Sequence, residues 1–276
     1  MAARERESLT MTETYSLVQT ELGAAIDRQT LEDASVAAPS VGRADCARIS
    51  RELFGVIVSG IPIEDALAFR AALLARKFSV EIAADRDLPR LPDGQFFNSL
   101  AVSDDGALMF SDVLGRREVC RADEMLLLAA GFMRRLRAKT EFKEVRIPYQ
   151  RGTTDFDRNG NLVERQHNLV SVPEFRFEWF IKRKPHRLRL MLDDNTHFVW
   201  NNHTLRLGKP DAIRAFMKTW RRHAPRVPWN LGLTNSGDDF EYPGRRAFEN
   251  EIRWRFYKLK QRARSVADGQ RVCFNK

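Results

Sequence analysis

The first part of the chain alternates between short apolar runs and helical patterns. The run "FGVIVSG" at 54–60 is almost continuously apolar and bounded by glycines, which is typical of a strand covered on both faces. The segment 62–78 predicts a helix that begins near a proline. Its predicted buried stripe is Leu67, Ala71, Leu74 and Phe78. The order strand, helices, strand, helix, strand predicts a small α/β sandwich over residues 14–92, comparable to half of a ferredoxin-like fold.

After Gly94 the pattern changes to short alternating segments separated by turns. An amphipathic helical pattern over 209–224 closes this series. Some seven strands followed by such a helix resemble a pleckstrin-homology-like barrel over residues 95–225, so the whole chain is predicted to be α+β. The run "EMLLLAAGFM" at 124–133 fits either a strand or a short helix, because periodicity does not separate the two in so compact a segment.

Asp155, Asp157, Asn159 and Gly160 follow the spacing D-x-D-x-N-G, with which a calcium loop of the EF-hand kind begins. Such a loop needs a bidentate glutamate at its twelfth position, where this chain has Gln166. Asn-Gly is also the commonest corner of a short hairpin. We therefore expect a polar hairpin inserted over about residues 135–168, with cation binding as the alternative.

Composition indicates a globular protein of about two domains. The chain has 276 residues, of which 43% are hydrophobic, and it has no apolar run long enough to span a bilayer. The first 13 residues lack the apolar segment of a secretory signal and are expected to be disordered. Three scattered cysteines argue against a disulfide framework. A cytoplasmic location is the expectation.

The net charge of +9 is concentrated at the C-terminus. Ten basic and three acidic residues lie between Tyr242 and Lys276, so this tail carries +7. Within residues 226–276 we predict a linker followed by a basic amphipathic helix. Its predicted apolar stripe consists of Phe248, Ile252, Phe256, Leu259, Ala263 and Val266.

This helix is the candidate binding surface. Basic side chains on its flanks are candidates for contact with nucleic-acid or other anionic groups, and two aromatic side chains between them are predicted to be exposed for stacking. The candidate residues are Arg246, Arg253, Lys260 and Arg264, with Trp254 and Tyr257. The apolar stripe can alternatively dock on its own protein, or lie on an anionic membrane surface.

An enzymatic alternative centres on "DDNTHFVWNNHT" at 193–204. Asp193, His197 and His203 are the residues that a metal-dependent phosphodiesterase would use there. Two histidines six residues apart on one strand lie about 20 Å from each other, so they share an ion only if the chain turns back at Asn201–Asn202. The favoured interpretation is a turn with surface histidines.

Other motifs carry little chemistry. Cys120 has no visible base partner, and no glycine-rich phosphate loop or G-x-S-x-G motif is present. The basic clusters at 116–117 and 181–189 are read as solvated faces that could also meet phosphate.

Two motif pairs carry a resemblance to a family. "GRADCARISRELFGVIVSG" followed by "LPRLP", and "DVLGRREV" followed by "LLLAAGFM", look like a family of bacterial proteins without an assigned activity. The resemblance covers most of residues 14–235, excludes the basic tail and supplies no catalytic residues. The sequence thus favours a non-catalytic binding or scaffold module without a cofactor. Its partner would be nucleic acid, an anionic membrane or another protein, and no pattern indicates an oligomeric state.

Overall fold

The computed structural model describes most of the chain. The described residues are 13–23, 25–103, 107–145, 162–184, 186–190, 197–200, 203–206, 214–215, 218, 226–235 and 240–273. For 135–145, 162–173, 197–200, 203–206 and 266–273 it describes the backbone only. The expected disordered N-terminus, the loop with Asp155, Asp157 and Asn159, and nearly all of the closing helix expected at 209–224 lie outside these residues.

The first unit is a three-stranded sheet with three helices. Its strands are β1 (Tyr15–Gln19), β2 (Val56–Ile61) and β3 (Val80–Ala84), and its helices are α1 (Arg28–Ser35), α2 (Arg43–Glu52) and α3 (Ile63–Ala75). The strand order is β2-β1-β3, and both outer strands pair antiparallel with β1. β2 and β3 are therefore parallel to each other and connected through α3, which makes a split β-α-β unit like that of half a ferredoxin-like fold.

The prediction of the buried face of α3 is wrong: the helix is rotated about its axis, so that a different set of apolar side chains is buried. The helix buries Ala66, Phe69 and Leu73, whereas Leu67 and Leu74 are 52% and 40% exposed. The sequence "ALAFRAALLA" is apolar nearly all round, so its periodicity does not single out one face. Only packing against α1 and the sheet decides which apolar side chains are covered.

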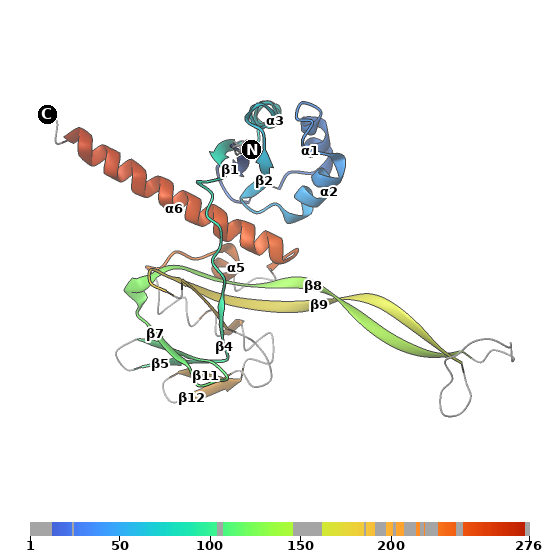
Figure 1. The fold of residues 1–276 in the computed structure, drawn as a ribbon, viewed down its shortest axis with the longest axis vertical. Helices are drawn as coiled ribbons and strands as arrows, with labels where there is room; N and C mark the ends of the chain where they lie inside the picture. The colour runs from blue at the N-terminus through green and yellow to red at the C-terminus, as the bar shows by residue number, and fades with distance from the viewer. Residues whose placement is uncertain are drawn as a thin grey trace, which may run out of the picture.

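The remaining strands form two further sheets (Figure 1). The sheet β13-β8-β9-β10-β4 contains β4 (Gln95–Phe97), β8 (Met125–Val145), β9 (Leu162–Ile181), β10 (Arg187–Leu190) and β13 (Glu241–Tyr242). The sheet β12-β11-β5-β6-β7 contains β5 (Ser99–Val102), β6 (Leu108–Ser111), β7 (Arg117–Cys120), β11 (His197–Trp200) and β12 (His203–Arg206). A 3₁₀ turn at Ala122–Glu124 leads into β8.

The α+β class is confirmed, and the described strands are not closed into a barrel. A closed barrel and a pair of facing sheets both require alternating strands, so element order alone does not distinguish them. The structure also resolves the ambiguous run at 124–133, most of which belongs to strand β8.

A large apolar core lies between these two sheets. Phe177 and Trp179 of β9 contact each other at 4.1 Å between ring centroids, and Trp179 lies 4.9 Å from Phe110 of β6. Leu188 and Leu190 of β10 are buried in the same core. Because side chains alternate along a strand, the intervening residues of β9 and β10 point to the opposite face of the sheet.

The strands β8 and β9 form a hairpin that reaches well beyond the sheet (Figure 1). Their pairing runs from Met125↔Ile181 to Val145↔Leu162. The described part of the polar insertion expected at 135–168 is therefore a continuation of two core strands.

Helix α6 (Arg245–Cys273) lies between the first unit and the sheet that contains β8 and β9, and packs on both (Figure 1). Its first turns bury Ala247, Phe248 and Ile252 against Leu127, Ala129 and Phe180 of the β8/β9 sheet. Farther along, Tyr257 and Trp254 pack on Val18 and Val56 of the first sheet, on the face away from α1–α3. The helix therefore docks on its own protein. A short helix, α5 (Leu231–Thr234), lies against β8. Among the described residues, no helix combines the length and the apolar character that a membrane span requires.

Gly55 is required where α6 crosses β2. Its φ is +80°, and a Cβ at this position would lie 2.5 Å from the Cβ of Trp254. Gly60 has a similar φ of +82° but open space around it. We expect Gly55→Ala to lower the free energy of unfolding by about 3 kcal/mol, from backbone strain and overpacking together, and Gly60→Ala by about 1 kcal/mol from strain alone. Urea denaturation measures both, and equal losses would contradict the close packing of α6 on β2.

Candidate functional site

A cavity of about 390 Å³ lies beside the first turns of α6. Three segments far apart in the sequence line it: the linker between β3 and β4, strand β10, and α6. The lining residues are Arg90, Leu91, Pro92, Asp93, Gly94, Arg187, Arg189, Arg245, Arg246, Glu249, Asn250 and Arg253. Its volume is at the lower end of the range for small-molecule sites, about 300–1,000 Å³.

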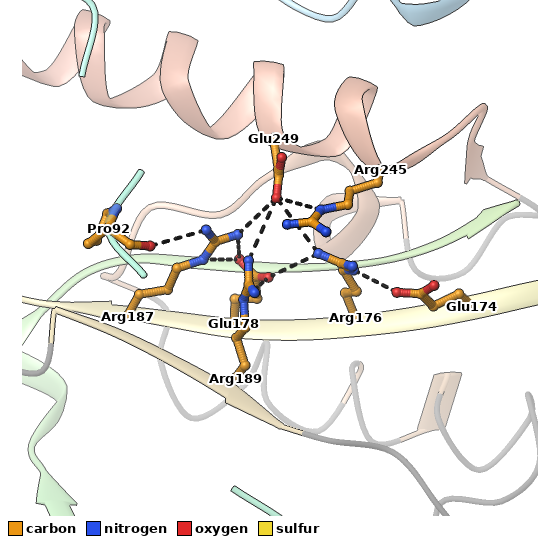
Figure 2. Close-up of polar contacts among 8 residues, drawn as sticks. All are labelled: Pro92, Glu174, Arg176, Glu178, Arg187, Arg189, Arg245 and Glu249. Atoms are coloured by element: carbon orange, nitrogen blue, oxygen red, sulfur yellow. Dashed lines mark hydrogen bonds and ion pairs between the residues drawn. The ribbon is translucent and has the colours of Figure 1, made fainter. Parts of the chain in front are cut away.

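The alternation of β9 and β10 places the charged side chains under α6. Leu188 and Leu190 point into the core between the sheets, so Arg187 and Arg189 point the other way. Glu178 of β9 is the direct cross-strand partner of Arg189. Figure 2 shows these side chains rising from the two strands toward Glu249 of α6.

Glu178 and Glu249 hold the arginines in place. The buried Glu178 carboxylate accepts from Arg187, with Nη2 to Oε2 at 2.7 Å, and its Oε1 lies 2.9 Å from Nε of Arg189. Oε1 of Glu249 lies 2.9 Å from Nε of Arg245 and 3.5 and 3.6 Å from the Nη2 atoms of Arg187 and Arg189 (Figure 2). Each carboxylate is thus shared between several guanidinium groups.

Further contacts complete this network around the cavity. Nε of Arg176, on β9, donates to Oε1 of Glu174 at 2.8 Å, and Nη1 of Arg176 lies 3.7 Å from Oε1 of Glu249. Arg187 also donates to the carbonyl oxygen of Pro92 at 3.3 Å, which ties the linker to β10. A Cβ on Gly94 would lie 2.4 Å from Cδ of Arg189, so the close passage of the linker over this side chain requires glycine.

Positive charge exceeds negative charge around the cavity. Its lining contains six arginines and two acidic residues, and two further carboxylates, Glu178 and Glu52, lie within ion-pair distance of lining arginines, so two positive charges remain in formal excess. Within the described part of the chain, no carboxylate lies within ion-pair distance of Arg90 or Arg253. Burial lowers the pKa of Arg253, and burial together with the neighbouring Arg187 and Arg176 lowers the pKa of Arg189 despite the opposing charge of Glu178. The guanidinium charges here lack full compensation, a state that a bound anion would relieve.

The surrounding arginines favour the ionised form of Glu249, the acidic lining residue that α6 contributes. Burial alone would raise the pKa of Glu249, but its hydrogen bond with Arg245 and the charges of Arg245, Arg187 and Arg176 outweigh burial and lower its pKa. Glu249 is therefore ionised at neutral pH and fixes α6 to the arginines of β9 and β10.

A second buried polar network anchors the same helix and is self-contained. The hydroxyl of Tyr242 donates to Glu251 at 2.5 Å and accepts from Asn230 at 2.8 Å. The other oxygen of Glu251 accepts from the backbone N–H of Leu231 and from Arg255. Burial, followed by the charge of Glu251, raises the pKa of Tyr242 well above its ordinary value. These groups satisfy one another's hydrogen-bonding capacity, so the network has a structural role.

The four basic candidate residues from the sequence separate into two groups. Arg246 and Arg253 line the cavity. Lys260 and Arg264 instead pair with Asp87, at 2.9 and 3.0 Å, on the distal half of the helix. The sequence therefore identified only part of the cavity.

The predicted exposure of the two aromatic residues is wrong. Trp254 donates from its indole nitrogen to the carbonyl oxygen of Gln19 at 2.6 Å, and Tyr257 is buried. Both cover the first sheet, because α6 packs on two sheets and so needs apolar side chains on two of its sides. Neither ring is placed to stack on a base.

The histidine-centred alternative gains no geometric support. The chain does turn back after Trp200, yet His197 pairs with Arg206 and His203 pairs with Trp200, at opposite ends of the β11/β12 ladder. Asp193 lies outside the described residues. Within those residues, no group of three or more His, Cys, Asp or Glu is suited to hold a metal ion. Burial raises the pKa of Cys120 to about 12, so this thiol is a poor nucleophile at neutral pH.

Comparisons of the chain with protein-family models, with curated proteins and with solved structures give no match.

Replacing Glu249 tests the link between α6 and the arginines. Because the pKa of Glu249 is lowered in the folded state, its contribution is present above the unfolded value of about 4.3 and is lost as the pH falls through the lowered value. We expect Glu249→Gln to lower the free energy of unfolding by about 2 kcal/mol at pH 7, with the difference from wild type shrinking below about pH 4.

The control is Glu241→Gln, which removes an exposed pair with Arg134 and should cost less than about 1 kcal/mol. Urea denaturation between pH 3 and 7 provides the measurement. If both variants lower the free energy of unfolding equally, or if the effect of Glu249→Gln does not change with pH, Glu249 does not hold the arginines of β9 and β10 to α6.

Proposed function

We propose that the protein is a non-catalytic binding module that holds the phosphate groups of a partner, nucleic acid in the first place, in the arginine-lined cavity beside α6. The observation that carries this proposal is the formal excess of two positive charges around the cavity, which matches Arg90 and Arg253, the two lining arginines without a carboxylate partner among the described residues. Charged groups held this close together repel each other unless an anion lies between them.

Arginine suits phosphate for a geometric reason. Its guanidinium group is planar, stays protonated at any physiological pH and offers two parallel N–H donors to two oxygens of one phosphate. Arg187 and Arg189 are held by Glu178, so they lose little conformational freedom when a ligand binds. Arg90 and Arg246, at the rim, are exposed and free to move toward a ligand.

The lining supports contact with a backbone rather than with bases. Its apolar residues are Leu91 and Pro92, and it contains no aromatic side chain. Contacts to phosphate alone fix a nucleic acid in place without reading its sequence. The proposed binding is therefore sequence-independent and strongly dependent on salt.

A membrane surface is the less favoured partner. Insertion at an interface requires an exposed apolar stripe, but Phe248 and Ile252 are fully buried and the ring of Phe256 lies 5.1 Å from that of Phe180. The first half of the stripe that suggested a membrane helix is used in packing.

Binding of a labelled single-stranded oligonucleotide at several salt concentrations tests the proposal. We expect Arg90→Ala and Arg253→Ala each to weaken binding and to reduce the salt slope by about one, because each removes one phosphate contact. Arg86→Ala is the matched control, since Arg86 is exposed in the same linker but pairs with Glu13 outside the cavity. Fluorescence anisotropy gives affinity and slope together.

Two outcomes would contradict the proposal. If Arg86→Ala weakens binding as much as Arg90→Ala, the contact is general surface charge. If Lys260→Ala with Arg264→Ala abolishes binding while Arg90→Ala and Arg253→Ala do not, the binding surface is the distal half of α6. Anionic vesicles provide the second arm, and binding to them in preference to the oligonucleotide would reassign the partner to a membrane.

A further inference from the structure

A second, smaller cavity of about 70 Å³ adjoins the first one on α6. The side chains of Arg246, Asn250 and Arg253 line both cavities. The remaining lining comes from the first unit: Arg48, Ile49 and Glu52 of α2 and Val56–Ser59 at the start of β2. The two cavities are therefore neighbours that share three α6 residues, and the start of the edge strand β2 lines the second one.

We propose that these two cavities form one groove for a linear chain of phosphate groups, with at least two phosphates bound at once. This inference rests on the proposed function, and it specifies the ligand class. A nucleic-acid backbone and inorganic polyphosphate share this chemistry. The first cavity holds one phosphate between Arg187, Arg189 and Arg90, and the chain continues past Arg253 and Arg246 toward Arg48.

The shared arginines favour such a chain. Arg253 is partly buried between the cavities and donates only to the carbonyl oxygen of Pro89, at 3.4 Å, among its described contacts. A cation in this position can attract anionic groups on both sides. One isolated phosphate would use one side, whereas two linked phosphates use both without a second loss of translational freedom.

Glu52 marks the place of the second phosphate. Its Oε2 lies 3.8 Å from Nη1 of Arg48 and 3.6 Å from Nε of Arg246, both at the long end of ion-pair distances. The same oxygen is buried and makes no hydrogen bond within the described structure. A carboxylate held so loosely between two arginines occupies the position that a phosphate would take with better geometry. Glu52 therefore competes with the ligand for Arg48 and Arg246.

Arg48 and Glu52, which lie one turn apart on α2, are expected to affect binding of a phosphate chain in opposite directions. Arg48→Ala removes a ligand contact in the second cavity, so it should weaken binding of a longer chain. Glu52→Gln removes the competing charge and keeps the shape, so it should strengthen binding of the same chain. Neither residue lines the first cavity, so binding of a single phosphate should change little in either variant.

The experiment is a titration of the full chain, without divalent cations, by isothermal calorimetry with orthophosphate, pyrophosphate, tripolyphosphate and a short oligothymidylate. At constant ionic strength, we expect tripolyphosphate to bind wild type at least about tenfold more tightly than orthophosphate, since each added charge-assisted contact contributes that order of affinity. We expect Arg48→Ala to lower the affinity for tripolyphosphate about tenfold and Glu52→Gln to raise it severalfold. Neither substitution should change the affinity for orthophosphate.

Arg51→Ala is the control on the same helix, because Arg51 is exposed outside both cavities and donates to the carbonyl oxygen of Ala47. Urea denaturation of each variant separates loss of folding from loss of binding, and the expected gain in Glu52→Gln does not depend on any loss. An unchanged or weaker affinity in Glu52→Gln, with Arg48→Ala equal to wild type, would overturn the two-cavity groove.

The outcomes separate this inference from the function on which it rests. If orthophosphate and tripolyphosphate bind equally well through Arg90 and Arg253, the proposed function stands and the groove for a chain is wrong. If none of the probes binds, both fail. If the groove is correct, tight binding of oligothymidylate identifies nucleic acid as its source of phosphates, whereas binding of tripolyphosphate alone identifies inorganic polyphosphate and overturns nucleic acid as the partner.

Discussion

The docking of α6 is the interaction on which the rest of the structure depends. One side of the helix buries Phe248 and Ile252 against the β8/β9 sheet, and another side presents Trp254 and Tyr257 to the first sheet. Glu249 adds an ionic link from the same helix to β10. Since the first unit and the sheet that contains β8 and β9 both pack on α6, a helix that appears last in the chain determines how they are arranged (Figure 1).

This docking also explains why a charged cavity exists inside a folded protein. The alternation that sends Trp179 and Leu188 into the core sends Glu178 and Arg187 to the opposite face, beneath α6. A buried arginine is tolerated only with partners, and the four arginines Arg176, Arg187, Arg189 and Arg245 share three carboxylates, those of Glu174, Glu178 and Glu249. The charge left over is the property from which the binding function is inferred.

Sequence patterns predicted those parts of the fold that local periodicity determines. The order of elements in the first unit, the alternation of β9 and the long C-terminal helix all appear in the structure. The buried face of α3 and the burial of Trp254 and Tyr257 did not follow from the sequence, because a helix that is apolar on several sides is oriented by its neighbours. The cavity was not predictable as a unit. Arg90, Arg187 and Arg253 come from three distant segments. The C-terminal helix and the 181–189 cluster each gave a signal for phosphate, but Arg90 gave none and no pattern placed the three together.

The central claim is that the surplus arginine charge beside α6 is a site for a multivalent anion. The most direct test is the melting temperature in tripolyphosphate compared with sodium chloride at the same ionic strength. A ligand that binds only the folded state, at about 100 times its Kd, should raise the melting temperature by about 5 °C or more. Our account predicts this rise in wild type and its loss when Arg90 and Arg253 are both replaced by alanine. Equal melting temperatures in the two salts would contradict it.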